Sequence, residues 1–558
     1  MRRGVRFETG EVRRTPADDR VTGDRTAVDK GVGMTVRRSR PGVLGLFLAL
    51  ILMLGLIPAG LAPAGAATGR GGGGGDFRPG SAGLGDAYYP LAGNGGYDVK
   101  HYLLKVAYDP ATDRLDGLAH ITARATQNLS RFNLDFVGLT VRSILVNGRP
   151  ATWTRTDHEL VVTPRAGLRK GKPFSVVVRY DGVPVTQEIV LGPDFSIEAG
   201  FMHTDDGAVI AGQPDVAATW YPVNDHPLDK AAYTFVVTVP KGLEVMANGK
   251  LAAHVTRGNH TTWVWDAREP MASYLATATM GQFDVKQYRT DDGMPMVDAL
   301  DPDLFDQPSG GAGSPSFGEI AAGSLARQGE ILDFLADQFG PYPFSTSGGI
   351  VDDYDNLFFA LETQTRPVYS KFFFTSPESG DSVVVHELAH QWFGDSVALA
   401  AWQHIWLNEG FATYAQWLWS EDQGLITAQE TFDATYGGIP ADAPFWDVVI
   451  GDPGVEFVFD NAVYDRGAMT LHALRREVGD ADFFRIVRTW AARKAGGNGT
   501  TAEFIALAER ISGQQLDKLF DVWLFTSGKP ALDDAFSSST RLSQEAAQPL
   551  RTDQRLRR

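Results

Sequence analysis

The chain has 558 residues, of which 43% are hydrophobic and 21% are charged, a balance typical of globular proteins rather than disordered chains or coiled coils. This length favours several domains. Because the chain contains no Cys, the sequence excludes disulfides, thiolate metal sites and Cys nucleophiles. The formal net charge of −17 argues against a general nucleic-acid-binding protein, which needs a basic face, so no nucleic-acid partner is expected.

The N-terminal region combines the parts of a secretory signal peptide. Residues 43–57 form an uninterrupted apolar run, with three arginines in residues 37–40 before it and small residues 64–66 after it. We therefore assign residues 1–67 to an N-terminal extension and signal peptide. We expect a secreted protein with no membrane partner once the signal is cleaved. A membrane-spanning helix needs about 20 apolar residues, so a retained anchor over residues 43–63 is the alternative, and the true start stays open between Met1 and Met34.

Residues 68–96 contain a tract of Gly and predict a flexible linker. From residue 97 to residue 285, short β-branched runs alternate with turn signals such as Asn147-Gly148 and Asn248-Gly249. Many short strands separated by turns are typical of an all-β sandwich, so we predict a β-sandwich-like domain here.

The second half of the chain has helical periodicity. Helices are predicted over residues 320–339, 384–398, 405–420, 464–478, 483–494 and 502–511, and an extended segment over residues 357–368. We assign residues 286–530 to a mainly helical domain with a small sheet, and the polar residues 531–558 to a flexible tail. The predicted fold class is therefore α+β and multidomain.

Residues 386–390 read His-Glu-Leu-Ala-His, which is a pattern with metal-site spacing. On a helix, His386 and His390 lie one turn apart on the same face, and Glu387 lies beside them without being a ligand itself. The alternative interpretation of this pentad alone is a charged helix face with two partly buried histidines.

A third candidate ligand, Glu409, falls on the next predicted helix. Two imidazoles and one carboxylate leave a coordination position for water, which is what a catalytic zinc site requires. Ligation by nitrogen and oxygen alone also suits a chain without Cys. The sequence therefore predicts a catalytic Zn²⁺ site.

Residues 386–395 (HELAHQWFGD) and 406–412 (WLNEGFA) closely resemble the aminopeptidase N family of zinc gluzincins, with the pattern HExxH-x18-E. The similarity covers roughly residues 97–530. It implies a thermolysin-like catalytic domain after the β domain. Since the chain ends soon after that domain, we expect a short form of the family without the helical C-terminal domain.

The resemblance implies a role for several residues. His386, His390 and Glu409 are expected to bind one Zn²⁺ per chain, and Glu387 to accept a proton from the attacking water as general base. Tyr464 lies in the segment Tyr-Asp-Arg-Gly-Ala and is expected to stabilise the oxyanion through its hydroxyl. A core aromatic at a helix start is the alternative for Tyr464.

The segment Phe-Ala-Leu-Glu-Thr at residues 359–363 stands where the family usually has Gly-Ala-Met-Glu-Asn. Glu362 is kept, and by resemblance it binds the free α-ammonium of a peptide, with Gln213 adding a hydrogen bond. The alternatives are a strand Glu that faces water and an amide in a turn. Phe359 and Thr363 depart from the family pattern and leave the substrate preference open.

Together these features predict a zinc-dependent aminopeptidase that hydrolyses N-terminal residues from peptides by a metal-activated water, with Glu387 as general base. The expected partners are peptides with a free N-terminus. A zinc endopeptidase or another hydrolase on the same site is the alternative, followed by a catalytically silent binding scaffold. The sequence leaves the oligomeric state open.

An acidic run, Asp352, Asp353 and Asp355, precedes the Glu362 segment. A solvated loop is the preferred interpretation of this run. A Ca²⁺ site, which would use carboxylate oxygens, is the alternative.

Overall fold

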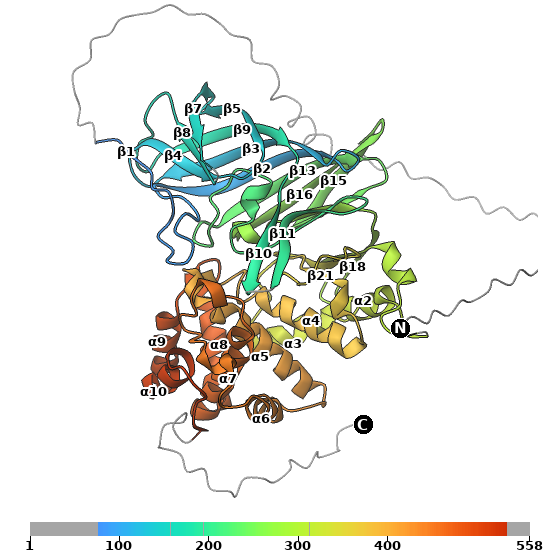
Figure 1. Cartoon of the computed structure of the whole chain (residues 1–558), viewed down its shortest axis with the longest axis vertical. Coiled ribbons are helices and arrows are strands. Elements are labelled where there is room, and N and C mark those ends of the chain that lie inside the picture. Colours follow the sequence, from blue (N-terminus) through green and yellow to red (C-terminus); the bar gives the residue numbers. More distant parts are fainter. Residues whose placement is uncertain (1–75, 157, 193–194, 312, 533–558) are drawn as a thin grey trace, which may run out of the picture. The chain divides into compact units, whose positions relative to one another are not determined.

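The computed structural model describes residues 76–156, 158–192, 195–311 and 313–532 (Figure 1). The predicted signal peptide and nearly all of the predicted tail lie outside these ranges. Every helix within the described ranges is too short or too polar to span a bilayer. The described residues all belong to one compact unit.

The strand-rich half contains three sheets. An eight-stranded sheet runs in the order β15 (Lys250–Arg257), β16 (His260–Met271), β13 (Ala231–Pro240), β2 (Tyr97–Asp109), β3 (Arg114–Ala125), β9 (Pro173–Gly182), β5 (Thr140–Val146) and β6 (Arg149–Pro150). A four-stranded sheet has the order β1 (Arg78–Pro79), β4 (Leu129–Asp135), β8 (Glu159–Thr163) and β7 (Thr152–Arg155). A five-stranded sheet has the order β10 (Thr186–Gly192), β11 (Phe195–His203), β12 (Ala208–Ala211), β17 (Ala278–Gly281) and β14 (Glu244–Ala247).

Alternation of buried side chains explains the eight-stranded sheet. In β13, Tyr233, Phe235, Val237 and Val239 are fully buried, while the residues between them are half-buried. Successive side chains of a strand point to opposite faces, so this strand presents one continuous apolar face to the core. The turn predicted at Asn147-Gly148 joins β5 to β6, and both residues have positive φ, as a tight hairpin requires.

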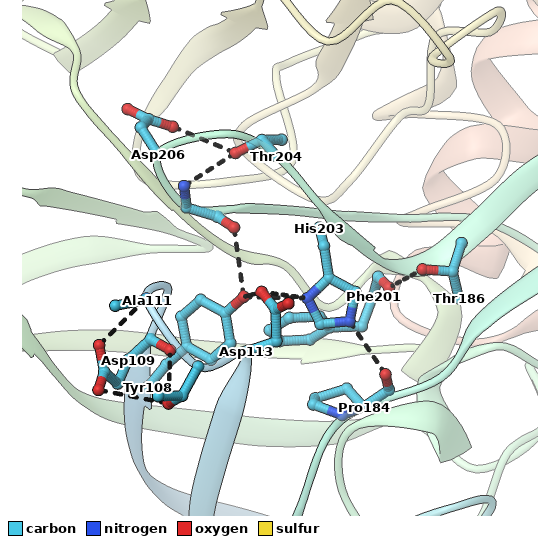
Figure 2. Close-up of polar contacts among 12 residues, drawn as sticks. Tyr108, Asp109, Ala111, Asp113, Pro184, Thr186, Phe201, His203, Thr204 and Asp206 are labelled. Atoms are coloured by element: carbon cyan, nitrogen blue, oxygen red, sulfur yellow. Dashed lines mark hydrogen bonds and ion pairs between the residues drawn. The ribbon is translucent and has the colours of Figure 1, made fainter.

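The β11–β12 turn is fixed by polar contacts at the end of the sheet (Figure 2). His203 Nε2 donates to the Pro184 carbonyl at 3.0 Å, and its Nδ1 lies 3.0 Å from the Tyr108 hydroxyl. Thr204 Oγ1 donates to Asp206 Oδ1 at 3.1 Å and accepts from the Gly207 amide at 2.9 Å. These contacts join the turn to β2 through Tyr108 and to the β9–β10 connection through Pro184.

The helical half begins with a small sheet in the order β18 (Asp284–Arg289), β19 (Pro295–Leu300), β20 (Ser347–Asp352) and β21 (Val368–Ser370). The pairs β19–β20 and β20–β21 are parallel. The helices that follow or flank it are α2 (Phe317–Leu325), α3 (Gln328–Phe339), α4 (Pro377–His390), α5 (Trp406–Asp422), α6 (Ala428–Gly438), α7 (Asn461–Val478), α8 (Asp480–Lys494), α9 (Thr501–Ser512) and α10 (Asp517–Phe520). The short strands β22 (Ala398–Leu399) and β23 (Asn498–Gly499) pair with each other. The predicted α+β architecture, strands first and helices second, is confirmed.

Two predicted helices have different bounds in the structure. The predicted helix 320–339 is two helices, α2 and α3, separated by a turn at Ala326 and Arg327. The predicted helix 384–398 is wrong at both ends, because Ser376 caps the start of α4 and the helix ends at His390. The chain then turns through Gly394 (φ +136°), a conformation that favours glycine.

Other predictions also differ from the structure. α6 was not predicted, although Thr427 and Glu430 form a capping box at its start. The segment 357–368 makes one isolated bridge, Leu361 with Val368, rather than a continuous strand.

Residues 76–96, part of the stretch predicted as a flexible linker, pack against the rest of the protein. Asp86 is buried, and its Oδ2 accepts a hydrogen bond of 2.8 Å from the Trp402 amide. The Tyr88 hydroxyl donates to Asp452 and accepts from the Gly454 amide. Residues 76–96 are therefore held by the rest of the protein, whereas residues 68–75 of the predicted linker lie outside the described residues.

Candidate functional site

Two helices bring together the three residues that sequence analysis singled out as metal ligands. α4 carries His386 and His390, and α5 carries Glu409. The Nε2 atoms of His386 and His390 lie 3.4 Å and 3.3 Å from Glu409 Oε2. The three ligand atoms lie within 4.8 Å of one another.

Hydrogen bonds orient both imidazoles. His386 Nδ1 lies 3.1 Å from Gln416 Oε1, and His390 Nδ1 lies 3.0 Å from the Phe393 carbonyl. Gln416 is held by its own amide nitrogen, which donates to Ser382. Because the Phe393 carbonyl can only accept, Nδ1 of His390 carries the proton. The other ring nitrogen, Nε2, faces Glu409 and is the atom that would bind a metal, the arrangement that metal-ligating histidines use.

The electrostatics of this group are those of an acid between two bases. Burial raises the pKa of Glu409, but His390 and His386 overcome that effect and lower it to about 2. Burial lowers the pKa of His390, while Glu409 and Glu362 raise it well above its usual value. The site therefore holds a carboxylate that stays ionised although it is 2% exposed.

Close packing of α5 against α7 places Tyr464. A Cβ added to Gly410 would lie 2.9 Å from the backbone of Gly467, and one added to Gly467 would lie 2.8 Å from Gly410. The absence of side chains at this crossing lets the two helices approach closely. The Tyr464 ring consequently stacks on His386, with a centroid separation of 6.0 Å and an interplanar angle of 20°.

Two further carboxylates lie beside the histidines. Glu387 is 5% exposed and Glu362 is 2% exposed, and each offers an oxygen within 4.8 Å of His390 and of the other carboxylate. The Tyr274 hydroxyl donates to Glu362 Oε1 at 2.9 Å. Burial is the main cause that raises the pKa of both carboxylates. The alternative for Glu362, a strand residue that faces water, is wrong, because the residue is buried.

The residues of the site line one cavity of about 610 Å³. It contains all seven residues singled out from the sequence, namely Gln213, Glu362, His386, Glu387, His390, Glu409 and Tyr464. The Gln213 Oε1 atom is buried with no hydrogen-bond partner among the described residues. Apolar side chains form the remaining wall, including Ile189, Ile197, Phe358, Phe359 and Phe459.

The segment that carries Glu362 is fixed by residues from both halves of the chain. Gln391 Nε2 donates to the Glu362 carbonyl at 3.0 Å, and Gln391 Oε1 accepts from the Thr365 amide at 2.8 Å. Thr363 turns its hydroxyl to the Arg366 carbonyl and stays buried, while Phe359 lines the cavity. Of the two departures from the family pattern, Phe359 is therefore the one that faces the cavity.

Sequence analysis missed the residues that orient the site. Tyr274, Gln391 and Gln416 come from separate segments, and only Gln391 falls within a quoted motif, residues 386–395, where no role was assigned to it. Their signal appears only as contacts across long sequence separations, such as 88 residues between Tyr274 and Glu362.

Comparisons with known proteins match this architecture. Residues 98–275 match the Peptidase M1 N-terminal domain and residues 329–523 match the Peptidase family M1 domain. The chain is 30% identical to a crystal structure of a two-domain M1 zinc metallopeptidase mutant bound to L-arginine, with a TM-score of 0.70, covering 81% of this chain and 99% of that one. It is 28% identical to an M1 zinc metallopeptidase mutant from Deinococcus radiodurans solved with a Tyr-Ser-Ala substrate. That match has a TM-score of 0.69 and covers 80% of this chain and 99% of the other.

Curated relatives are longer than this chain. It is 26% identical over 341 residues to Aminopeptidase M1 of Arabidopsis thaliana, which covers 58% of this chain but 37% of that protein. The chain thus spans well under half of that relative and nearly the whole of the two solved structures. The N-terminal domain and the peptidase domain of family M1 both match this chain in that order, and the chain covers 99% of a solved M1 structure to which it is 30% identical. The chain therefore belongs to peptidase family M1.

Proposed function

We propose that this protein is a zinc-dependent aminopeptidase that removes N-terminal residues from peptides. The observation that carries the proposal is the convergence of two imidazoles and one ionised carboxylate in a cavity that also buries Glu362 and Glu387. Similarity to M1 zinc metallopeptidases, one of them solved with a tripeptide substrate, supports the same reading.

The donor set fits zinc. His386, His390 and Glu409 would hold one Zn²⁺ per chain, because their donor atoms already face one another and each imidazole is oriented through its other nitrogen. A zinc ion held there supplies a Lewis acid that polarises the scissile carbonyl and increases the acidity of water.

Glu387 serves as general base in this proposal. Its carboxylate lies in the cavity beside His390 and is almost fully buried, so it can take a proton from the attacking water and return it to the leaving amine. Burial favours the protonated carboxyl and raises the pKa of Glu387, which makes it an effective holder of that proton between the two steps.

Tyr464 donates a hydrogen bond from its hydroxyl to the oxygen that becomes negatively charged as the carbonyl is attacked. The ring is held against His386 by stacking, and its position on α7 is set by the Gly410–Gly467 contact. Burial, together with nearby carboxylates, raises the pKa of Tyr464 well above its usual value, so the hydroxyl stays protonated and able to donate.

Glu362 and Gln213 anchor the free α-ammonium of the substrate. A buried carboxylate pairs strongly with a cation, and the unpartnered Gln213 Oε1 is an acceptor in need of a donor. Both groups line the cavity that contains the predicted zinc ligands. Together they select peptides by their N-terminus and position the first peptide bond for hydrolysis.

The decisive experiment offers the zinc-loaded protein one short peptide with a free N-terminus and the same peptide acetylated, with products identified by mass. Stepwise loss of single residues from the free peptide alone is expected. Glu362→Gln should lower kcat/KM for the free peptide, with Glu378→Gln, an exposed residue on α4, as the matched control.

Internal cleavage of both peptides would overturn the exopeptidase assignment and favour a zinc endopeptidase. Phe359 in the cavity wall is the specific feature that keeps this second candidate in view, since a bulky ring replaces the small residue of the family pattern there. Hydrolysis of neither peptide would favour a silent scaffold.

Two further assignments concern export and the boundary between the domains. Export is supported by the apolar run at residues 43–57 with its basic flank and small residues at 64–66. A boundary between the two domains near residue 285 is supported by β18, which starts at Asp284 and pairs with β19 in the small sheet of the helical half.

A further inference from the structure

Three buried or half-buried carboxylates meet at one end of the small sheet, outside the candidate active site. Asp301 follows β19, Asp352 ends β20 and Asp353 comes next in the chain. One oxygen of each lies within 4.8 Å of the other two. Asp301 is 6% exposed and Asp352 is 1% exposed, so this group differs from an acidic surface patch.

Each of the three carboxylates is oriented through one oxygen. Asp301 Oδ1 accepts from the Asp303 amide at 2.8 Å, and Asp352 Oδ1 accepts from the Tyr354 amide at 3.0 Å. Asp353 Oδ2 accepts from Gln307 Nε2 at 3.1 Å. The second oxygen of Asp352 is buried and has no hydrogen-bond donor among the described residues. A buried carboxylate oxygen without a donor is costly, so it demands a ligand or a proton.

Burial raises the pKa of Asp353, and the charge of Lys371 offsets that effect only in part. Within the described ranges, no ion pair joins Asp301, Asp352 or Asp353 to a Lys, Arg or His. The nearest cation, Lys371, instead contacts Asp355 at 2.6 Å and the backbone carbonyl of Asp353 at 2.6 Å. Asp355, which lies in the same acidic run of the sequence, therefore forms an ion pair with Lys371. The third carboxylate of the cluster is Asp301 instead.

Further acidic residues strengthen the negative potential at this position. Asp206 lies on the β11–β12 turn, where one of its oxygens accepts from Thr204 (Figure 2). Its other oxygen accepts from the Gln282 amide. Its charge nevertheless acts on the cluster. Burial, with repulsion from Asp353 and Asp206, raises the pKa of Asp301 to about 7. Burial and repulsion from Asp301 also raise the pKa of Asp352 well above its usual value.

We propose that Asp301, Asp352 and Asp353 bind one hard divalent cation, Ca²⁺, as a structural ion distinct from the zinc of the proposed function. All the donors are oxygens, which hard cations prefer, and the group contains no imidazole to attract zinc. Two oxygens on one Ca²⁺ lie at most about 5 Å apart, given Ca–O distances of about 2.3–2.6 Å. The observed limit of 4.8 Å fits this span.

The ion would hold the segment that forms one wall of the cavity. Asp353 starts the stretch that leads to Phe358, Phe359 and Glu362. The next residue, Tyr354, donates its hydroxyl to Glu198 of β11 at 2.5 Å. A cation on Asp353 therefore fixes the first residue of a segment that contacts both halves of the protein.

The test is isothermal titration of Ca²⁺ into the full, zinc-loaded chain dialysed free of other divalent cations, with a parallel thermal melt. One binding event per chain is expected. The Tm is expected to rise by about 2–3 °C at a hundredfold excess of Ca²⁺ over its Kd. Since neither measurement uses a peptide, failure here is distinguishable from failure of the aminopeptidase proposal.

Asp352→Asn should weaken Ca²⁺ binding by at least about 100-fold, because even residues that only orient metal ligands change affinity by about 10–100-fold. Without Ca²⁺ this variant should melt at or above the wild-type Tm, since it relieves repulsion among buried charges. Asp355→Asn, in the same loop but outside the cluster, is the matched control and should bind Ca²⁺ as wild type does.

Absence of Ca²⁺ binding by the wild-type chain would overturn the proposal and leave shared protons as the means by which the cluster is neutralised. Unchanged binding by Asp352→Asn would also overturn it. Tighter binding of Mg²⁺ than of Ca²⁺ would overturn the assignment to calcium. The wild-type titration decides the matter even if a variant fails to fold.

Discussion

Two groups of buried carboxylates lie in the helical half of this protein, and they differ in their neighbours. Glu409 lies between two imidazoles, which lower its pKa to about 2 in spite of burial. Asp301 lies among other carboxylates, and burial with their repulsion raises its pKa to about 7. The same chemical group is thus ionised in one setting and close to half-protonated at neutral pH in the other.

The difference teaches which cation suits each group. Imidazole nitrogens with one carboxylate match zinc, which accepts nitrogen ligands and leaves a position open for chemistry. An all-oxygen group without bases matches a hard cation with a structural role. Each prediction below replaces one residue of a site and states the expected change in zinc content, activity or Tm.

The largest effect is expected from replacing Glu409, the carboxylate that lies between the two imidazoles. Glu409→Gln should weaken zinc binding by at least about 100-fold and abolish peptide hydrolysis, because an anionic ligand is lost. Metal content by mass spectrometry and hydrolysis of the free peptide measure the two effects. Glu421→Gln, later on the same helix, is the control, and full zinc content in Glu409→Gln would contradict the ligand assignment.

Glu387→Gln should separate metal binding from chemistry. Zinc content should equal that of wild type, whereas kcat should fall by about 10²–10⁴-fold, the usual contribution of a general base. Steady-state kinetics on one peptide, beside Glu378→Gln from the same helix, provide the measurement. A variant with wild-type kcat would remove Glu387 from the mechanism.

Tyr464→Phe should keep both zinc and fold, because the ring still stacks on His386. The loss of one donor to the developing oxyanion should lower kcat by about 10²–10³-fold. Tyr436→Phe, whose hydroxyl contacts the Pro530 carbonyl away from the cavity, is the matched control. If KM alone changed, Tyr464 would bind substrate rather than stabilise the transition state.

The smallest effect is a pH-dependent change in stability at the second cluster. The pKa of Asp301 is about 7 in the folded chain, above its ordinary value of 3.8. The folded state therefore binds more protons between these values, and stability contributed by the protonated carboxyl is lost as the pH rises toward 7. In cation-free buffer, the Tm of Asp301→Asn relative to wild type should rise from pH 5 to pH 8.

The comparison is sharpened by adding Ca²⁺ to the same series of melts. Saturating Ca²⁺ should stabilise wild type most at high pH, where the carboxylates are ionised, and should reverse the order of the two proteins. A difference in Tm that is independent of pH, with or without Ca²⁺, would argue against titration of Asp301.

The zinc-ligand candidates could be predicted because their spacing is a local property of one helix and its successor. His386 and His390 share a face at i and i+4, and Glu409 follows on the next apolar helix. The strand-rich half was likewise visible in alternating residues such as those of β13. Periodicity and motif spacing encode this information within short stretches of chain.

What escaped prediction depends on contacts between distant segments. Asp301 lies beside Asp352 because β19 and β20 are parallel neighbours in the small sheet. No local sequence pattern predicts that pairing. The end of α4 at His390 depends on the turn through Gly394 and on the Asp395 amide, which donates to the His390 carbonyl. Propensity favoured a longer helix there, and tertiary contacts prevailed.

The segment at residues 76–96 has a consequence for how the protein unfolds. Asp86 contacts the helical half at Trp402, and Asn94 donates through its side-chain amide to Asp135 of the strand-rich half. Tyr88 adds a second attachment at Asp452 and Gly454. This short stretch therefore adds to direct contacts between the halves, such as Tyr274 with Glu362, so the two halves should melt in a single cooperative transition. A protein trimmed to residue 97 should keep that single transition at a lower Tm.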